Sequence, residues 1–407
     1  MFLNRVIILT LILVGATSSH AYSKVDESKI SWPGEQWEVS SPEIEGVGAE
    51  AIKEIVEGIE SGLYGSVDHF LVIKNGRIIA DHKYSVNYDE LLASNVATEV
   101  NNSPIIHEQY NYDDTRWHPF FNGGNLHTLQ SVTKSITSAA FGIAIDEGLI
   151  KDVNQPIYPY FKNFKYDMSD PRKSEITIED LLTMRTGIDW FTDGGYDNNN
   201  HSTVVMENSD NWLQYILDRP MDKKPGTSYE YNDGSSVLLG KILSEATGVR
   251  ADEWAKKKLF TPIGIHNFKW KITPKGETDT EGGLYLSTYD LARIAYLFLR
   301  EGQWKGKQIV SKAWVQKSVS AIVENINPDN DKGSPGYGYQ WYSKGKGESS
   351  IYLGAGYGGQ YIVVSPKFDI VMVFNSWSVH KKSKKNPHKV LEDIIIPAIQ
   401  EQTSKKL

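Results

Sequence analysis

The sequence contains no cysteine in its 407 residues. The chain therefore has no disulfide, no thiolate nucleophile, no zinc–thiolate site and no thiol for lipid attachment. Its 10 histidines are scattered, without the His-Glu-x-x-His spacing or another pattern typical of metal ligands. The sequence implies no metal site and no cofactor.

Positive charge is also scarce, because 43 Lys and Arg face 51 Asp and Glu, which gives a formal net charge of −8. No extended basic stripe interrupts this balance, so the chain has little means to neutralise phosphates, and we expect no nucleic-acid partner. Apolar residues make up 40% of the chain and aromatic residues 11%, enough to bury a large core. This composition excludes a disordered chain.

Long hydrophobic runs are confined to the N-terminus. Arg5 leads into the apolar segment 6–14, and small residues follow it up to Ala21. The run is too short to span a bilayer, and its Ser-x-Ala end resembles a signal-peptidase site. We predict that residues 1–21 are a signal peptide and that the protein is exported, periplasmic or secreted, with no stable membrane insertion after cleavage. The alternative is an uncleaved N-terminal anchor.

Apolar periodicity predicts strands at both ends of the chain and helices between them. A helix over 48–62 precedes two apolar runs joined by Asn75-Gly76, a strong hairpin signal. A second hairpin is expected over 361–374, and a final helix over 390–400, interrupted by Pro397. Further helices are expected where a capping residue precedes an apolar run: 178–184 after Thr177, a segment opened by Ser235 or Ser236, and 288–300 after Ser287.

This order predicts an α/β (α+β) fold with one central antiparallel sheet from two distant segments, flanked by helices. An N-terminal arm over 22–44 would precede a single domain over 45–407. Within that domain, the sheet subdomain is expected over about 45–125 and 270–407. The inserted, mainly helical subdomain is expected over about 126–269.

The stretch Ser131-Val132-Thr133-Lys134 stands where a polar turn gives way to an apolar-periodic run. A spacing of three places the lysine beside the serine on one helical face, and a serine hydroxyl needs such a neighbour to act as a nucleophile at neutral pH. Because Ser131 would start the helix, the N-terminal amides favour the anion that forms during attack. The run up to Leu149 predicts a helix buried on one side, which Gly148 would end.

The same Ser-x-x-Lys spacing recurs at Ser343 and Ser378. Glycines and lysines surround Ser343, and the lysine-rich segment 381–389 follows Ser378, so we interpret both as serines in solvated loops. The spacing alone is therefore weak, and the prediction of a nucleophile depends on the context of Ser131. His127, four residues before Ser131, is a less favoured candidate for the base that activates the serine.

Five stretches follow one another in a recognisable order across about 45–400. They are Leu129–Ser135, Leu181–Gly187, Pro225–Asp233 leading to Leu238–Gly240, Gly282–Ser287 with Asp290–Arg293, and Gly356–Tyr361. Together they resemble the serine β-lactamase and D,D-peptidase superfamily, in the class C-like branch that includes esterases and 6-aminohexanoate-dimer hydrolases. The resemblance implies a β-lactamase-like fold, with Ser131 as nucleophile and Lys134 beside it.

The resemblance places Tyr231 at the family's catalytic tyrosine, with Tyr229 as the competitor in the same Tyr-Glu-Tyr run. A tyrosine beside a lysine ammonium is expected to have a lowered phenol pKa, so that it can take the serine proton and return it to the leaving group. Asp233 stands where β-lactamases have asparagine. If ionised, it can pair with Lys134; the alternative is a turn aspartate that binds backbone amides.

The last of the five stretches, around Gly356–Tyr361, differs more from the family pattern, and we call it the third motif. Relatives that act on β-lactams or peptidoglycan stems carry a cation or hydroxyl on the inner strand, whereas 354–360 here contains no charge. Glycines let a strand backbone approach an acyl group closely, so an N–H near Tyr357 is expected to join that of Ser131 as an oxyanion hole. The predicted substrate-binding and oxyanion residues are Gly356, Tyr357, Gly358, Asp233 and Gln360.

We therefore predict a serine hydrolase that cleaves an ester or amide through an acyl-enzyme on Ser131, with Lys134 and Tyr231 as proton shuttle. Its partner would be a small-molecule ester or amide, and the protein would be a monomer or homodimer. One alternative is a penicillin-recognising D,D-peptidase or β-lactamase, and another is a catalytically silent ligand-binding protein. Segments 85–126 and 190–210 are expected to shape the pocket.

Overall fold

The computed structural model describes residues 30–84, 125–327, 334–345, 350–377 and 383–404. The predicted signal peptide and almost all of the segment 85–126 lie outside these residues. Within the part of the chain that is described, no helix has the length and apolar character needed to cross a membrane.

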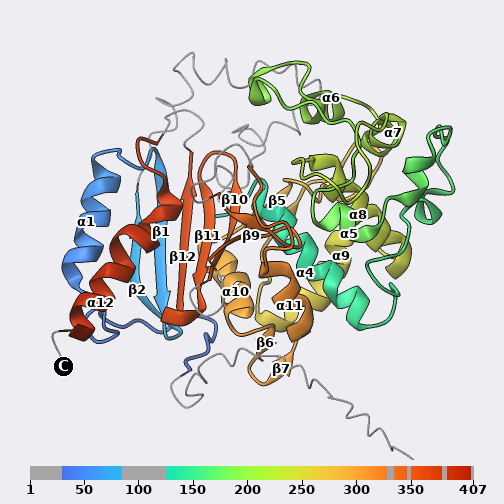
Figure 1. Cartoon of the computed structure of the whole chain (residues 1–407). Helices are drawn as coiled ribbons and strands as arrows, with labels where there is room; N and C mark the ends of the chain where they lie inside the picture. The colour runs from blue at the N-terminus through green and yellow to red at the C-terminus, as the bar shows by residue number, and fades with distance from the viewer. Residues whose placement is uncertain (1–29, 85–124, 328–333, 346–349, 378–382, 405–407) are drawn as a thin grey trace, which may run out of the picture.

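A seven-stranded antiparallel sheet lies at the centre of the molecule (Figure 1), with the strand order β2-β1-β12-β11-β10-β9-β8. Its strands are β1 (Val67–Lys74), β2 (Arg77–Lys83), β8 (Gly336–Tyr337), β9 (Tyr342–Lys344), β10 (Ile351–Gly356), β11 (Gln360–Ser365) and β12 (Ile370–Ser376). Because β1 pairs with β12, the first and last strands of the described residues lie side by side, next to the edge strand β2. The predicted antiparallel sheet from two distant segments is confirmed.

Both predicted hairpins are present. In the first, Asn75 and Gly76 have φ of 53° and 78°, the left-handed pair that a two-residue turn between twisted strands requires. A Cβ on Gly76 would lie 2.1 Å from the carbonyl oxygen of Ser31, so the N-terminal arm crosses directly over this turn.

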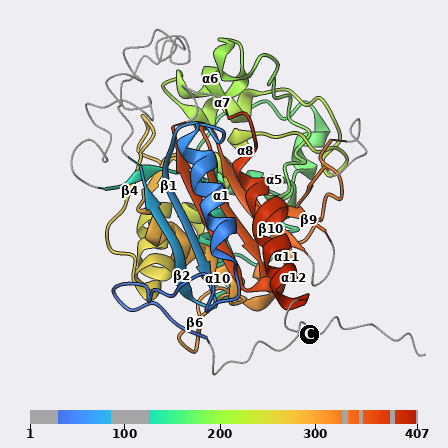
Figure 2. The ribbon, with the colours of Figure 1, turned by 90° about the vertical axis from the view of Figure 1, so that its left-hand side faces the viewer.

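The central strands are buried on both faces, which explains their continuous apolar runs. In β1, Phe70 and Val72 pack on one side, and Leu71 and Ile73 on the other. Helices α1 (Ala49–Glu60) and α12 (Ile396–Ser404) cover the first face, in front of the sheet in Figure 2. The other face packs against α10 and α4, so the sheet lies between two helical layers.

The chain between β2 and β8 builds the second layer and the mainly helical part of the molecule. Its helices are α4 (Val132–Asp146), α5 (Ile178–Leu182), α6 (Ser202–Glu207), α7 (Trp212–Asp218), α8 (Asp233–Thr247), α9 (Ala251–Ala255), α10 (Thr288–Leu299) and α11 (Lys312–Val319). Its short strands are β3 (His127–Thr128), β4 (Lys269–Trp270), β5 (Leu284–Leu286), β6 (Gln303–Trp304) and β7 (Lys307–Gln308). Strands β3, β5 and β4 form a three-stranded sheet, which ties the start of α4 to the segment before α10.

Helix starts follow the predicted caps in two cases. Thr177 and Asp180 form a reciprocal capping box at α5, and the Ser287 hydroxyl accepts from the backbone N–H of Asp290 at α10. Helix α8 differs, because it begins at Asp233 and not after Ser235 or Ser236. Its cap is Asn232, whose side chain accepts from the backbone N–H of Ser235.

Three further expectations are corrected. Helix α4 is buried on all sides from Val132 to Ala144, and the hydroxyls of Ser135 and Thr137 donate to surrounding carbonyls instead of facing water. Ser343 lies buried in β9 and not in a solvated loop. The C-terminal helix has a π-helical turn over Leu391–Ile395 before the α-helical part, next to Pro397, which lacks the N–H of a regular ladder.

Candidate active site

Ser131 is the residue that precedes the first turn of α4, as the sequence predicted. Gln130 before it has a φ of 48°, a left-handed conformation that turns the chain sharply into the helix. Helix α4 then carries Lys134 one turn on, and its Nζ lies 3.0 Å from Ser131 Oγ. The pairing expected from the spacing of three is therefore present.

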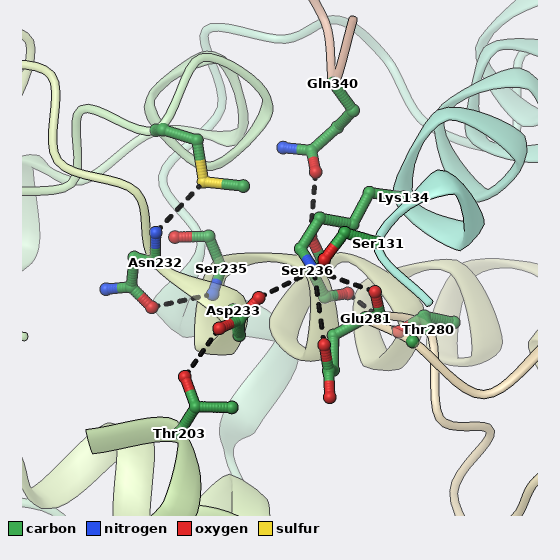
Figure 3. A network of polar contacts seen from close by, with 12 residues as sticks. Ser131, Lys134, Thr203, Asn232, Asp233, Ser235, Ser236, Thr280, Glu281 and Gln340 are labelled. Atoms are coloured by element: carbon green, nitrogen blue, oxygen red, sulfur yellow. Dashed lines mark hydrogen bonds and ion pairs between the residues drawn. The ribbon is translucent and has the colours of Figure 1, made fainter. Parts of the chain in front are cut away.

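The Lys134 ammonium is enclosed, with its side chain only 1% exposed. Its Nζ lies 2.6 Å from Asp233 Oδ1 and donates to the backbone oxygen of Glu281 at 2.7 Å. A second carboxylate oxygen, Glu281 Oε2, lies 3.2 Å away. Figure 3 shows Asp233 and Glu281 approaching the ammonium from two sides, with Ser131 next to it.

These contacts fix the charge of Lys134 and Asp233. Burial lowers the pKa of Lys134, but Asp233, Tyr231 and Glu281 outweigh it and hold that pKa well above 10.5. Burial would raise the pKa of Asp233, whereas the Lys134 charge and hydrogen bonds from Lys134 and Thr203 bring it below 3.8. The two groups form a buried ion pair, so the expectation that Asp233 can pair with Lys134 is met.

Tyr231 lies where α8 begins and completes the cluster. Its ring lies beside the lysine, with Lys134 Nζ 5.3 Å from the ring centre, and both Lys134 and Ser131 are near enough to act on the pKa of its phenol. The expected lowering of its pKa is wrong, because burial outweighs the lysine and raises the pKa of Tyr231 to about 12. Tyr231 is therefore a neutral phenol at neutral pH.

The competing residues are engaged elsewhere. The ring of Tyr229 packs against that of Tyr337, with centroids 5.4 Å apart. His127, buried in β3, has Nδ1 2.8 Å from the carbonyl oxygen of Thr128, and its Nε2 faces Asp68 at 3.8 Å. The structure thus places Tyr231 beside Lys134, whereas Tyr229 packs against Tyr337 and His127 lies against Thr128 and Asp68.

The uncharged third motif lies on β10 and the turn to β11, directly beside the serine. A Cβ on Gly356 would meet the carbonyl oxygen of Leu129 at 2.3 Å, two residues before Ser131. Only a residue without a side chain lets the strand come so close. Gly358, with a φ of 83°, belongs to the tight turn that follows.

The two side chains predicted to bind substrate in this motif differ. Tyr357 is 41% exposed, and its ring meets that of Tyr196 edge to face at a centroid distance of 5.1 Å. Gln360 is 1% exposed, and its amide donates to Ser376 O at 2.6 Å and accepts from Ser376 N at 3.1 Å. The structure therefore places Gln360 as a residue that ties the start of β11 to the end of β12.

Several site residues had not been predicted. Thr203 Oγ1 donates to Asp233 Oδ2 at 2.5 Å, and Tyr196 lies 3.4 Å from the same oxygen. Both belong to the segment 190–210. Glu281, the second carboxylate on Lys134, immediately precedes Gly282-Gly283, and an acidic residue beside a glycine pair and an apolar strand was the signal that could have revealed it.

No group of three or more histidine, aspartate and glutamate side chains is arranged to hold a metal ion among the described residues. The chemistry that the geometry offers is that of a serine in contact with a lysine ammonium, with a phenol beside the lysine and two carboxylates flanking it.

A model of the Beta-lactamase family matches residues 61–393. The chain belongs to this family. A 6-aminohexanoate-dimer hydrolase from Paenarthrobacter ureafaciens is 25% identical over 267 residues, which cover 62% of this chain and 66% of that protein. An N-acetylmuramyl-L-alanine amidase from Bacillus subtilis is 25% identical over 54% of this chain and 46% of its own length. The chain thus spans about two thirds or less of the curated relatives it matches.

Solved structures show the same fold over most of the chain. A Bacillus anthracis protein named as a candidate 6-aminohexanoate-dimer hydrolase superposes with a TM-score of 0.66 at 18% identity, covering 93% of this chain and 89% of that one. EstCE1, described as a hydrolase with promiscuous acyltransferase activity, gives a TM-score of 0.61 at 13% identity, with 85% and 98% covered. The predicted β-lactamase-like fold and the resemblance to serine hydrolases of this family are confirmed.

The closeness of β10 to the serine gives a test of the site's construction. Replacing Gly356 by Ala should push the strand away from Leu129, lowering stability by about 1–3 kcal/mol and activity with it. Thermal unfolding and ester hydrolysis measure the two effects. Ala355→Ser, next along the strand but on its other face, is the matched control, and equal behaviour of the two variants would contradict the close approach.

Proposed function

We propose that this protein is an exported serine hydrolase that cleaves an ester or amide through an acyl-enzyme on Ser131. The observation that carries the proposal is the contact of Ser131 Oγ with Lys134 Nζ at 3.0 Å, with the ring of Tyr231 centred 5.3 Å from the same Nζ. A nucleophile with proton-transfer groups within hydrogen-bond reach is the arrangement that acyl transfer requires.

The reaction begins with attack of Ser131 Oγ on the carbonyl carbon. A C–O bond forms, the serine O–H bond breaks, and its proton passes to the Lys134–Tyr231 pair. Because both groups of the pair already carry their protons, the pair passes one proton on to a neighbouring acceptor as it takes up that of the serine. Tyr231, which keeps its proton at neutral pH, then supplies a proton to the leaving group as the tetrahedral intermediate collapses. Water deacylates the serine by the reverse sequence of proton transfers. Backbone N–H groups of Ser131 and near Tyr357 would hold the oxyanion.

Charge favours substrates that lack a carboxylate beside the scissile bond. The Lys134 ammonium is matched by Asp233 and Glu281, and the turn from β10 to β11 carries no charged side chain. A substrate carboxylate would therefore meet no spare cation there and would be repelled by Asp233. We expect little β-lactamase or D,D-carboxypeptidase activity.

Two activity-based probes separate this proposal from its rivals. The mature protein is treated with a fluorophosphonate and, separately, with labelled penicillin, and the adducts are mapped by mass spectrometry. Labelling of Ser131 by the fluorophosphonate alone is the expected result. Labelling by both supports a penicillin-recognising enzyme, and labelling by neither a silent binding protein. N-terminal sequencing of exported protein, expected to start at Tyr22, tests the export signal.

A further inference from the structure

Lys134 presents a difficulty for the proposed reaction, because it already carries its proton. An ammonium has three N–H donors and no lone pair. The contacts of Lys134 agree with this, because every partner of its Nζ is an acceptor. Asp233 Oδ1, Ser131 Oγ and both the backbone oxygen and the carboxylate of Glu281 lie 2.6 to 3.2 Å from it. It can accept the serine proton only if it passes one of its own to a neighbour.

Two carboxylates are placed to receive that proton, and they differ in how readily they do so. Asp233 is held in its ionised form by the ion pair and by the hydrogen bond from Thr203. Glu281 is 5% exposed, and burial, only partly offset by Lys134, raises its pKa to about 7. A carboxylate whose pKa lies near the working pH is the better acceptor in a transient proton transfer.

Glu281 is itself supported by Glu207, the last residue of α6. The carboxyl of Glu207 is buried, and its pKa is held well above 4.5 by burial and by the negative charge of Glu281. The hydrogen bond between them raises the pKa of Glu207 and lowers that of Glu281. Glu207 is thus the protonated donor of the pair and Glu281 the acceptor, an arrangement that two adjacent buried carboxyls favour.

The other ionisable groups around this pair come from several elements. Those that act on Glu281 or Glu207 are Lys134 of α4, Asp233 of α8, Asp279 beside Glu281 and Lys271 after β4. Tyr231, Tyr196 and His201 act on the Lys134–Asp233 pair. The acceptor oxygen nearest the reacting centre remains Glu281 Oε2, at 3.2 Å from Lys134 Nζ.

We propose that Glu281, held in place by Glu207, receives through Lys134 the proton that Ser131 loses on acylation. The inference rests on the proposed function. As Ser131 Oγ bonds to the carbonyl carbon, its proton moves to Lys134 Nζ and a Lys134 proton moves to Glu281 Oε2, while the carbonyl electron pair becomes the oxyanion. When the leaving group takes the Tyr231 proton, Lys134 restores it and Glu281 returns the proton to Lys134. Glu281 acts through Lys134 and is a positioning residue.

The test follows the pH dependence of the attack step alone. The rate of fluorophosphonate labelling of Ser131 serves, since fluoride leaves without needing a proton. In the wild-type protein this rate should fall on the acid side of about pH 7, where Glu281 takes up a proton in the resting state and can no longer accept one. Glu281→Gln should lower the plateau rate by about 10²-fold or more and remove this acid limb.

Variants of Glu207 provide the matched pair. Glu207→Gln keeps an N–H donor to Glu281, so the acid limb should stay near its wild-type position. Glu207→Ala removes the hydrogen bond that lowers the pKa of Glu281, so the limb should move to higher pH. A merely structural role would change the unfolding temperature of these variants without moving the limb.

The outcomes separate this inference from the function on which it rests. If the wild-type protein is not labelled at all, the proposed hydrolase function fails. If the wild-type protein is labelled but Glu281→Gln keeps its rate and its acid limb, only the role of Glu281 is overturned. Should Glu281→Gln fail to fold, an unmoved limb in folded Glu207→Ala overturns it equally well.

Discussion

Replacing Ser131 by alanine should lower the rate of ester hydrolysis on the order of 10⁴-fold or more, since the other groups of the site cannot supply a nucleophile. The residual rate reflects only binding and electrostatic stabilisation. The removed hydroxyl is small, and Lys134 keeps Asp233 and Glu281 as partners, so the unfolding temperature should change little. Initial rates with a nitrophenyl ester and a thermal scan measure both.

The matched control for this variant is Ser343→Ala. Ser343 opens a second Ser-x-x-Lys sequence but lies in β9, where it contacts neither Lys134 nor Tyr231 in the described interactions. Its replacement should leave the rate of hydrolysis within a factor of two or so, as expected of a serine with no catalytic role. Comparable losses of hydrolysis rate in the two variants would mean that Ser131 is not the nucleophile.

Replacing Asp233 by leucine should have the largest effect on stability, about 3–5 kcal/mol, because it leaves the enclosed Lys134 ammonium with one carboxylate fewer. Activity should fall with it, since Lys134 and Tyr231 lose their positions beside Ser131. Chemical denaturation measures the change in the free energy of unfolding. The exposed pair of Glu50 and Lys53 is the control, and Glu50→Gln should have no measurable effect.

The pH dependence of stability gives this ion pair a second signature. The pKa of Asp233 is lower in the folded protein than 3.8, so its contribution is present above that value and is lost as the pH falls through the folded pKa. The pKa of Lys134 is higher in the folded protein than 10.5, so its contribution is present below that value and is lost only at strongly alkaline pH. Between these two limits the wild-type protein should keep a higher free energy of unfolding than Asp233→Leu. Loss of that difference within this pH range would contradict the ion pair.

Much of the site was readable from the sequence because its signals are local. The spacing of Ser131 and Lys134 within one helical turn determines their distance, and the Asn75-Gly76 turn determines a hairpin. The order of motifs also selected Tyr231 over Tyr229, and the fold placed the ring of Tyr231 beside Lys134. The alternation of polar and apolar residues misjudged α4, since a helix surrounded by protein on all sides presents its polar residues to protein and not to water, as Ser135 does to the carbonyl of Gln340.

The protonation of the site could not be read in the same way. Whether a lysine lowers the pKa of a neighbouring tyrosine depends on how completely the two are buried, and here burial wins at Tyr231. Glu281 and Glu207 are 74 residues apart in sequence and come from different elements, so no spacing rule joins them. Their pairing exists only because the end of α6 lies near the segment before β5.

The sequence by itself determined a β-lactamase-like fold and a serine and a lysine one helical turn apart. It also determined that the glycine-containing segment 354–360 carries no charged residue. Tertiary structure alone decided which groups hold protons. It enclosed one ammonium between Asp233 and Glu281, left Tyr231 a neutral phenol and placed Glu207 behind Glu281. The physical reason is that helical spacing is fixed within a few residues, whereas desolvation and charge are summed over every element that packs around the site.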